Sequence, residues 1–374
     1  MSEVGLSDHA GDGERQGDEA VLGARLDQAL AAIAADAAEL DESPRFPREA
    51  IFHLADAGAL AATIGAIREE RSVRAEWQLL RCVAAADSSV GRILDGHLNA
   101  VERLEVAAEP EVRERELAPV SAGERLLGVW GADPGPGEGE PARLTEIGSG
   151  LMLSGVKTFC SGAGGVDGAL VMVGNDDGAP PALALLDCGG EVEVDRSWYR
   201  AAGLRASESH RVVFHDAPVT SILGEPGELS RDPWFSRDAM RTAASWAGMI
   251  DAAVAAALGD LALRHAEEPL AHLAAGRIAA GQGTVDAWLD HAATAADSSL
   301  ARPADLRPCS VAMRAEIAAA AREVLEAAAA GCGSHPFVTG GRLDRVRRDL
   351  ETFLLQHRLD PLLARLGAER LARR

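Results

Sequence analysis

The stretch LSGVKTFCSGAGGVDGALVMV, residues 153–173, holds two apolar β-type runs that are separated by a glycine-rich segment. Comparable runs follow at 182–187, 191–194 and 210–219, with Gly, Asp, Asn and Pro between them. Short apolar runs with turn-forming residues between them are typical of small barrels and sandwiches. We therefore predict a small β-barrel or sandwich between about residues 126 and 219.

The sequence on both sides of this β-region has apolar residues at helical spacing. Before it, residues from about 19 to 116 are rich in alanine and leucine, and Ser43 and two prolines precede an apolar run, as at a helix start. After it, long helices are predicted at 232–265, 268–297, 305–330 and 341–372. Such helices can pack as an antiparallel bundle, with a loop at 331–337 before the last of them.

These patterns together predict an α+β chain of four parts. The parts are a disordered N-terminus at 1–19, an N-terminal α-helical domain at 20–120, a middle β-domain at 121–228 and a C-terminal four-helix bundle at 229–374. The N-terminus is assigned as disordered because it is polar and rich in glycine.

The composition argues against several classes of partner. The formal net charge of −21, from 58 acidic and 37 basic residues, disfavours nonspecific binding to nucleic acid or to anionic membranes. The most apolar stretch, residues 247–263, contains Asp251 and Asp260, which favours an amphipathic helix over a membrane span. Residues 1–19 have no apolar core of the kind that a signal peptide needs. We expect a soluble, cytoplasmic protein.

The cysteines and histidines predict no metal site. The 5 cysteines are scattered without a CxxC pair, which favours reduced thiols over a disulfide framework or a structural zinc site. The 10 histidines include no HxxxH or HExxH pattern.

Four short motifs, in order along the chain, carry a resemblance to a known family. They are GVKTFCS within 153–173, WYRAAGLRASESHRVVFHDAPV at 198–219, GEPGEL at 224–229 and RLDRVRRDLETF at 342–353. These motifs, and the order of helices, small β-domain and helical bundle, resemble the acyl-CoA dehydrogenase superfamily. The resemblance implies an acyl-CoA dehydrogenase-like fold and a flavin between the β-domain and the bundle.

The resemblance also implies which residues contact the flavin. The family's aromatic-x-Ser/Thr contact corresponds to Phe159, Cys160 and Ser161, where Ser161 would offer a hydroxyl or a backbone N–H to the N5 side of the ring and Cys160 would be a small residue on its face. Donors of this kind stabilise the charge that reduction places on a flavin. In the alternative interpretation, Phe159 and Ser161 only end a strand.

A second flavin loop of the family corresponds to WGADPGPGEGEP, residues 130–141. Ala132 stands where the family has a threonine, and Glu138 stands near its serine, so only backbone N–H groups between Ala132 and Gly137 remain as donors. Glu138 would lie near the substrate and disfavour a second anion there. A plain surface turn is the alternative.

The diphosphate end of a bound FAD would lie against Arg264, Gly331 and Gly333 by the same resemblance. The aromatic residue that usually follows this glycine loop is replaced by Ser334 and His335. Because the signature is partial, FMN or a reduced flavin supplied by a partner reductase is an alternative to FAD.

The family's catalytic glutamate is absent from both of its usual positions. Eight residues after Asp349, where most members have it, stands His357, and the other position corresponds to Met240 and Arg241. Arg241 is therefore predicted to face the substrate. Acyl-CoA dehydrogenation needs a carboxylate that removes a proton, so the standard reaction is doubtful.

Two histidines take the place of that carboxylate in the prediction. On a continuous helix His357 would extend the apolar stripe of Leu350 and Phe353, and His97 would share a face with Leu94 and Val101. This layout resembles the superfamily's flavin-dependent monooxygenases, and histidine can act as acid or base near neutral pH. The alternative for each is a core histidine that donates to a backbone carbonyl and is held neutral by burial.

The expected function is that of a flavin-dependent oxidoreductase acting on a small molecule or an acyl thioester, with His357 and His97 as catalytic residues. A two-component monooxygenase that takes reduced flavin from a reductase is the sharper alternative. A catalytically silent scaffold of the same fold is the third. By resemblance, the protein is expected to be a homodimer or homotetramer.

Overall fold

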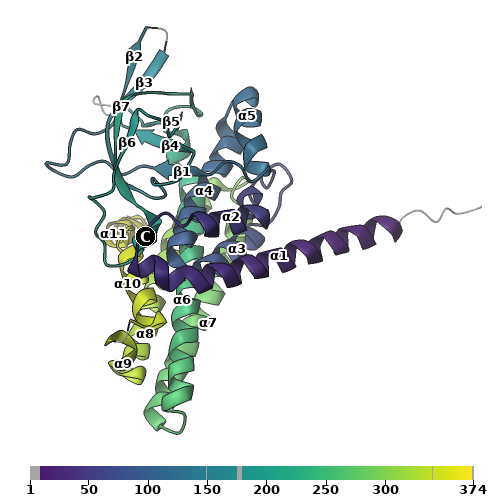
Figure 1. Ribbon diagram of the computed structural model, residues 1–374, viewed down its shortest axis with the longest axis vertical. Helices are drawn as coiled ribbons and strands as arrows, with labels where there is room; N and C mark the ends of the chain where they lie inside the picture. Colours follow the sequence, from purple (N-terminus) through teal and green to yellow (C-terminus); the bar gives the residue numbers. More distant parts are fainter. Residues whose placement is uncertain (1–8, 149, 175–178, 339, 373–374) are drawn as a thin grey trace, which may run out of the picture.

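The computed structural model describes residues 9–148, 150–174, 179–338 and 340–372. Helices come first, eight short strands follow, and helices return to the C-terminal end of the described chain (Figure 1). This order confirms the predicted α+β class with its helical, β and helical parts.

The N-terminal helices pack around a buried helix, α4. The helices are α1 (His9–Glu42), α2 (Arg48–Asp56), the 3-10 turn η1 (Ala59–Ala61), α3 (Val73–Ala86), α4 (Ser88–Ala107) and α5 (Pro110–Ser121). The Asp87 side chain begins α4 by accepting a hydrogen bond from the Val90 N–H at 2.9 Å. Nearly every residue from Ser88 to Leu104 is buried.

Helix α1 begins at His9, inside the segment predicted to be disordered; residues 1–8 lie outside the described residues. The second half of α1 buries Ile33, Ala37 and Leu40. Once packing has formed a helix, each added residue gains one hydrogen bond at little cost, and α1 continues past its packed half (Figure 1).

The middle region is a two-sheet sandwich, as predicted. Its strands are β1 (Leu127–Trp130), β2 (Arg143–Ile147), β3 (Gly150–Cys160), β4 (Gly168–Val173), β5 (Ala182–Asp187), β6 (Val192–Asp195), β7 (His210–Pro218) and β8 (Ser221–Ile222). One sheet has the order β1-β4-β5-β8 and the other β2-β3-β7-β6. The rings of Trp130 and Phe214, from different sheets, lie 6.3 Å apart in the core between them.

Gly155 allows the sandwich to close. Its φ is +114°, and a Cβ there would stand 2.6 Å from the Pro141 carbonyl oxygen. The β3–β7 register shifts at this point, as at a β-bulge. Only glycine fits such a close approach at positive φ.

The C-terminal helices form the bundle. They are α6 (Trp234–Arg264), α7 (Pro269–Asp297), α8 (Pro303–Cys332), the short α9 (His335–Val338), α10 (Arg342–Leu354) and α11 (Leu359–Ala372). Alanines dominate the core between α6, α7 and α8. At Gly248 of α6, a Cβ would come within 2.1 Å of the Arg81 carbonyl oxygen, so this glycine lets α3 lie directly against α6.

The helix predicted at 341–372 is broken, and the break carries His357. Helix α10 ends at Leu354 and α11 starts at Leu359. Pro361 has no N–H, so it fits the first turn of a helix but not the interior of one, and the chain restarts just before it. Within the predicted loop at 331–337, α8 runs on to Cys332 and α9 starts at His335.

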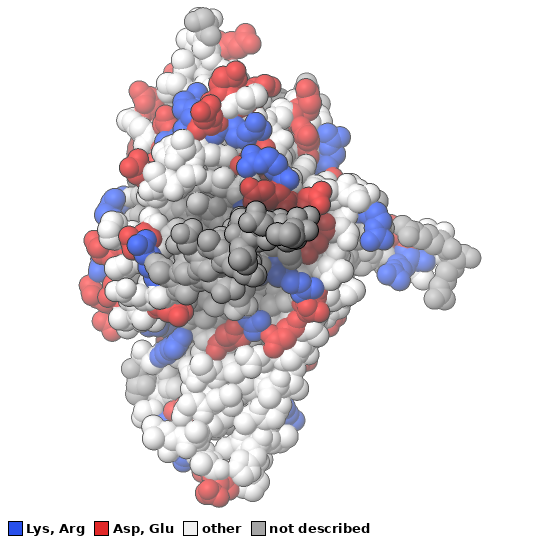
Figure 2. Space-filling model, turned by 90° about the vertical axis from the view of Figure 1, so that its right-hand side faces the viewer, with Lys and Arg blue, Asp and Glu red and all other residues white. Residues whose placement is uncertain are grey.

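Helix α6 is long and apolar enough to cross a membrane by length and composition, but 56% of its most apolar window is buried inside the bundle. A core helix of a bundle gives the same result, so this is weak evidence for a span. Toward the end of the bundle farthest from the β-domain, Figure 2 shows few charged side chains apart from an acidic group at the tip. Leu263, Leu270 and Leu273 are exposed at that end.

Candidate functional site

A cavity of about 630 Å³ lies where the β-domain, α4, α6 and the break after α10 meet. Its volume is in the range of small-molecule sites. Its lining contains more apolar than polar surface, with a few charged groups, among them Arg92, Arg103, Asp238 and Arg358. The cavity brings together segments from all three parts of the chain.

Four residues of the predicted site line this cavity: Ala132, Phe159, Ser161 and His357. Cys160, Gly137, Glu138, Arg241, His97, Arg264, Gly331 and Gly333, also predicted as site residues, are not among its lining residues.

Phe159 gives the cavity a flat aromatic wall. Its side chain is 59% exposed, and its ring meets Trp198 edge-on at 4.9 Å between centroids. Its φ is +51°, which is uncommon for a bulky residue and concentrates at functional sites. An exposed ring held in this way can stack on or abut a planar ligand.

Ser161 starts a chain of buried hydroxyl groups. Its Oγ lies 2.8 Å from Ser209 Oγ, which lies 2.8 Å from Ser207 Oγ. The Ser207 hydroxyl donates to the Leu204 carbonyl at 2.7 Å. The Ser161 backbone N–H donates to the Phe159 carbonyl at 2.9 Å, so the predicted backbone donor for a flavin is already used.

Cys160 is fully buried in the core of the sandwich and does not line the cavity, so its predicted place on the flavin face is not supported by this geometry. Burial raises the pKa of its thiol well above the usual value, which excludes a reactive thiolate. Side chains alternate across a strand, so Phe159 and Cys160 face opposite ways.

His357 borders the cavity from the break between α10 and α11. Its ring lies 5.2 Å from that of Trp246, and its Nδ1 accepts a hydrogen bond from Arg314 Nη1 at 3.3 Å. Burial, followed by the nearby charges of Arg314 and Arg92, lowers its pKa to about 3. His357 is therefore neutral, with its proton on Nε2.

His97 has the structural role that was its alternative interpretation. It is fully buried; its Nδ1 accepts from the Leu127 N–H at 3.0 Å, so its Nε2 carries the proton and donates to the Leu60 carbonyl at 2.9 Å. Burial lowers its pKa to about 4. Both ring nitrogens hold the backbone of η1 and β1 against α4, which favours the structural interpretation, and a catalytic role for His97 stays a prediction.

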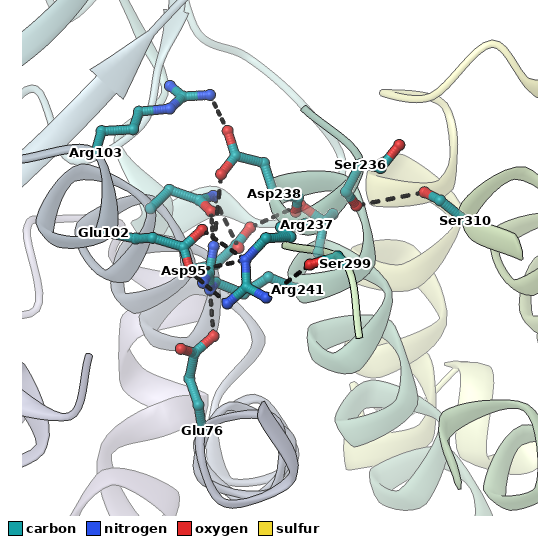
Figure 3. Close-up of polar contacts among 12 residues, drawn as sticks. Glu76, Asp95, Glu102, Arg103, Ser236, Arg237, Asp238, Arg241, Ser299 and Ser310 are labelled. Carbon is teal, nitrogen blue, oxygen red and sulfur yellow. Dashed lines mark hydrogen bonds and ion pairs between the residues drawn. The ribbon is translucent and has the colours of Figure 1, made fainter. Parts of the chain in front are cut away.

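Arg241 belongs to a buried ion-pair network behind the cavity (Figure 3). Only 1% of its side chain is exposed, and it pairs with Glu76, with Glu102 at 3.0 Å and with Asp238 at 3.5 Å. Arg237 also pairs with Glu102, at 2.7 Å. Its donors are used by these groups and it does not line the cavity, so the contact of Arg241 with the substrate stays a prediction that this geometry does not support.

The arginines of this network offset the cost of burying the Glu102 carboxylate away from water. Burial alone would raise the pKa of Glu102, but the guanidinium groups of Arg241 and Arg237 lower it to about 2. Asp238 pairs with Arg103 at the cavity wall. Arg103 Nε and Nη1 are buried without a hydrogen-bond partner among the described residues.

Glu138 closes a turn and does not face a ligand. Its carboxylate accepts from the Gly135 N–H at 2.7 Å and from Trp198 Nε1 at 2.9 Å. These two hydrogen bonds lower its pKa. Gly137 is exposed in the same turn with φ +84°. Neither residue lines the cavity, so the contacts of Glu138 and Gly137 with substrate and cofactor stay predictions.

Arg264, Gly331 and Gly333 lie at the far end of the bundle. Helix α6, with 31 residues, spans about 45 Å, and Arg264 is its last residue, paired with Asp260 at 2.6 Å. Gly331 packs against Ala274 and Leu261 at the same end. Within one chain these residues lie away from the cavity, and their predicted contact with the diphosphate of FAD stays a prediction.

The sequence reasoning missed several residues of the wall, including Arg92, Asn99, Tyr199, Ser209 and Asp238. Tyr199 is the single tyrosine of the chain and stands inside a motif that had been recognised. Ser207 and Ser209 stand two apart in the same motif. That spacing on a loop was the available signal for a hydroxyl chain.

Asp349 fixes the loop that carries Leu204 into the cavity wall. It is buried, and its Oδ1 accepts from the Leu204 N–H at 2.6 Å. Burial is the main cause that raises its pKa to about 7. Leu204 has φ +54°, so the loop needs this anchor to keep its conformation.

Replacing Asp349 with Asn is expected to remove a pH dependence of stability. Because the pKa of Asp349 is raised in the folded state, its protonation stabilises the fold. This contribution to the free energy of unfolding is complete below the unfolded pKa of about 4 and is lost as the pH rises through about 7. Asn keeps an acceptor for Leu204 without the charge, so the variant should be more stable than the wild type by about 2–4 kcal/mol at pH 8 and similar at pH 4. Urea unfolding at both pH values measures this. Glu351→Gln, an exposed change on the same helix, is the control; a variant destabilised equally at both pH values would show that the carboxyl acts only as an acceptor.

No family model matches the chain. A dibenzothiophene monooxygenase of Rhodococcus erythropolis is 31% identical over 173 residues, which are 42% of this chain and 41% of that protein. The chain thus matches about two fifths of the length of the curated relatives.

Solved structures match nearly the whole chain. TdsC from Paenibacillus sp. A11-2, a dibenzothiophene monooxygenase determined with FMN and indole, superposes with a TM-score of 0.83 at 19% identity, over 94% of this chain and 97% of that one. Methanesulfinate monooxygenase MsuC from Pseudomonas fluorescens gives 0.80 at 22% identity, over 94% and 96%. The chain has the acyl-CoA dehydrogenase-like fold that these monooxygenases share.

Proposed function

We propose that this protein is a flavin-dependent oxidoreductase and, more narrowly, a two-component monooxygenase that binds reduced FMN in the 630 Å³ cavity. The observation that carries this proposal is the cavity itself, which places an exposed aromatic wall, Phe159, and a neutral histidine, His357, around one ligand-sized space. The FMN-bound structure of a chain with the same fold supports it.

The residues present fit a flavin mononucleotide better than FAD. Phe159 and Ala132 offer uncharged surface, and Arg358 at the wall can neutralise one phosphate, whereas Arg92 is already paired with Asp95 at 2.8 Å. The residues predicted for the diphosphate of FAD, Arg264 among them, lie at the other end of α6. We therefore propose FMN as the cofactor.

When bound, reduced flavin supplies two electrons that activate O₂. In the net reaction, one oxygen atom is added to the substrate, the other leaves as water, and the flavin loses two electrons and two protons. The task of the chain is to exclude water and to place donors near the reacting oxygen. His357 holds a proton on Nε2 for that purpose, because its Nδ1 accepts from Arg314.

Dehydrogenation of an acyl thioester, the competing reaction, is disfavoured by the lining. Asp238 is the only carboxylate among the described lining residues, and it is paired with Arg103. With a pKa of about 3, His357 is a weak base. The cavity therefore lacks the group that removes an α-proton.

The proposed reaction is tested with the purified protein, a separate flavin reductase, NADH, FMN and ¹⁸O₂. Dibenzothiophene, indole and methanesulfinate serve as first substrates, because they are named for proteins of this fold. Substrate-dependent incorporation of one ¹⁸O atom supports the monooxygenase. Bleaching of bound oxidised flavin by an acyl-CoA would favour dehydrogenation of an acyl thioester. If the protein binds no flavin, the catalytically silent scaffold is the remaining hypothesis.

The substrate is proposed to be a small molecule, and a flavin reductase is the proposed partner. The weakly charged end of the bundle, with Leu263, Leu270 and Leu273 exposed, is proposed as a contact between copies of the chain. Sedimentation velocity of the wild type and of Leu270→Glu tests this self-association.

A further inference from the structure

The hydroxyl chain that begins at Ser161 has one direction. A carbonyl oxygen can only accept, so the Ser207 hydroxyl proton lies on the Leu204 carbonyl. Ser209, 2.8 Å from Ser207, must then donate its own proton to Ser207. Ser161, 2.8 Å from Ser209, must in turn donate to Ser209.

The consequence is a fixed polarity at the cavity wall. The only hydroxyl proton of Ser161 points away from the cavity, and its backbone N–H is used by the Phe159 carbonyl. What Ser161 presents to a ligand is therefore a lone pair. The three serines are at least nine-tenths buried, which shields the chain from exchange with solvent.

We propose that Ser207 and Ser209 act as positioning residues that make Ser161 an acceptor, so that the site selects a ring N–H over a bare ring nitrogen. Reduced flavin carries a hydrogen on N5, whereas N5 of oxidised flavin is only an acceptor. The same serine therefore attracts the reduced ring and leaves the oxidised ring facing a second lone pair. This inference rests on the proposed binding of flavin in the cavity, and it reverses the donor role that the sequence predicted for Ser161.

The selectivity is expected to be modest. Reversing the chain would cost one buried hydrogen bond, that from Ser207 to Leu204, whose carbonyl also accepts from the Ser207 N–H at 3.0 Å. Loss of one such bond corresponds to a change in relative affinity of about tenfold.

Ser207→Ala changes the direction of the hydroxyl chain without removing a side chain that lines the cavity. Ser207 does not line the cavity, and without its oxygen the Ser209 proton can turn to Ser161 or to the Tyr199 hydroxyl; when it turns to Ser161, Ser161 can donate into the cavity. The dissociation constants of oxidised and of reduced FMN are measured anaerobically for the full-length wild type and the variant. We expect the wild type to prefer reduced FMN, and the variant to lose about tenfold of that preference, equivalent to about 30 mV in the two-electron potential of the bound flavin.

Two further variants make the result specific. Ser209→Ala also frees the Ser161 proton and should shift the ratio of the two constants in the same direction. Thr242→Val deletes a different hydroxyl of the cavity wall, one that contacts Asp95 at 3.1 Å, and should leave the ratio unchanged.

The possible outcomes separate a failure of this inference from a failure of the proposed function, flavin binding in the cavity. If Ser207→Ala and Ser209→Ala bind both forms of FMN with the ratio of the wild type, the polarity does not select the redox state and the inference is overturned, while flavin binding stands. If the wild type binds neither form, the proposed function fails and the inference fails with it.

Discussion

Replacing Arg241 with methionine is expected to lower the free energy of unfolding by about 3–5 kcal/mol. The change leaves the Glu76 carboxylate, at 7% exposure, buried without its ion-pair partner, and leaves Glu102, at 3% exposure, paired with Arg237 alone. Uncompensated buried charge costs far more than the ion pair contributes in net terms. Chemical denaturation at pH 7 measures the loss.

Arg74→Met provides the matched control. Arg74 pairs with Asp290 on the surface, where both side chains are well exposed, and such pairs contribute about 1 kcal/mol or less. Adding Glu76→Gln to Arg241→Met should restore part of the stability, because one stranded charge is removed. If Arg241→Met lowers the free energy of unfolding no more than Arg74→Met does, the buried network does not stabilise the fold in the way that its burial indicates.

Replacing His357 with phenylalanine is expected to reduce product formation by about 10²–10³-fold while reduced FMN still binds within a few-fold of the wild-type affinity. The substitution keeps an aromatic ring against Trp246 but removes the Nε2–H donor. Flavin should still be reoxidised, with hydrogen peroxide released in place of oxygenated substrate. Product and peroxide are measured in the same reaction with a reductase.

His357→Gln, which can keep a donor, should recover part of the product yield. The pH profile adds a second check, because a pKa of about 3 leaves His357 neutral across pH 5–8. The pH profiles of product formation should therefore have the same shape for the wild type and for His357→Gln, without an additional step near pH 6.5 in the wild type. A step of this kind would mean that the histidine titrates, and that its role is acid–base transfer rather than donation from a neutral ring.

The fold was predictable because its signals are local. Turn residues between apolar runs indicated the sandwich, and the stripe through Leu350 and Phe353 indicated the buried face of α10, which is buried as expected. The predicted continuation of this stripe to His357 is wrong, because the helix ends at Leu354 and restarts at Leu359, just before Pro361. His357 lies in the break between the two helices. A periodicity does not reveal where packing stops supporting a helix.

The site was predictable only where backbone position decides it. Phe159 and Ser161 reach the cavity because they lie at the end of β3 and directly after it, on a strand that the resemblance located. His97 and Arg241 looked the same in sequence as functional residues, since an ionisable side chain on an apolar face is compatible with either role. Their partners, the Leu60 carbonyl and Glu76, are far away in sequence, and only the folded chain brings them together.

The measurement that tests the central claim most directly is an anaerobic titration of reduced FMN into the wild type, Gly96→Trp and Gly259→Trp. Gly96 lines the cavity and has open space beyond its Cα, so tryptophan there would fill the proposed site; Gly259 also has open space, but it lies in α6 away from the cavity. We predict saturable, one-to-one binding in the wild type and Gly259→Trp, and its loss in Gly96→Trp. Binding that survives in folded Gly96→Trp, or that is absent from the wild type, would contradict the assignment of this cavity as the flavin site.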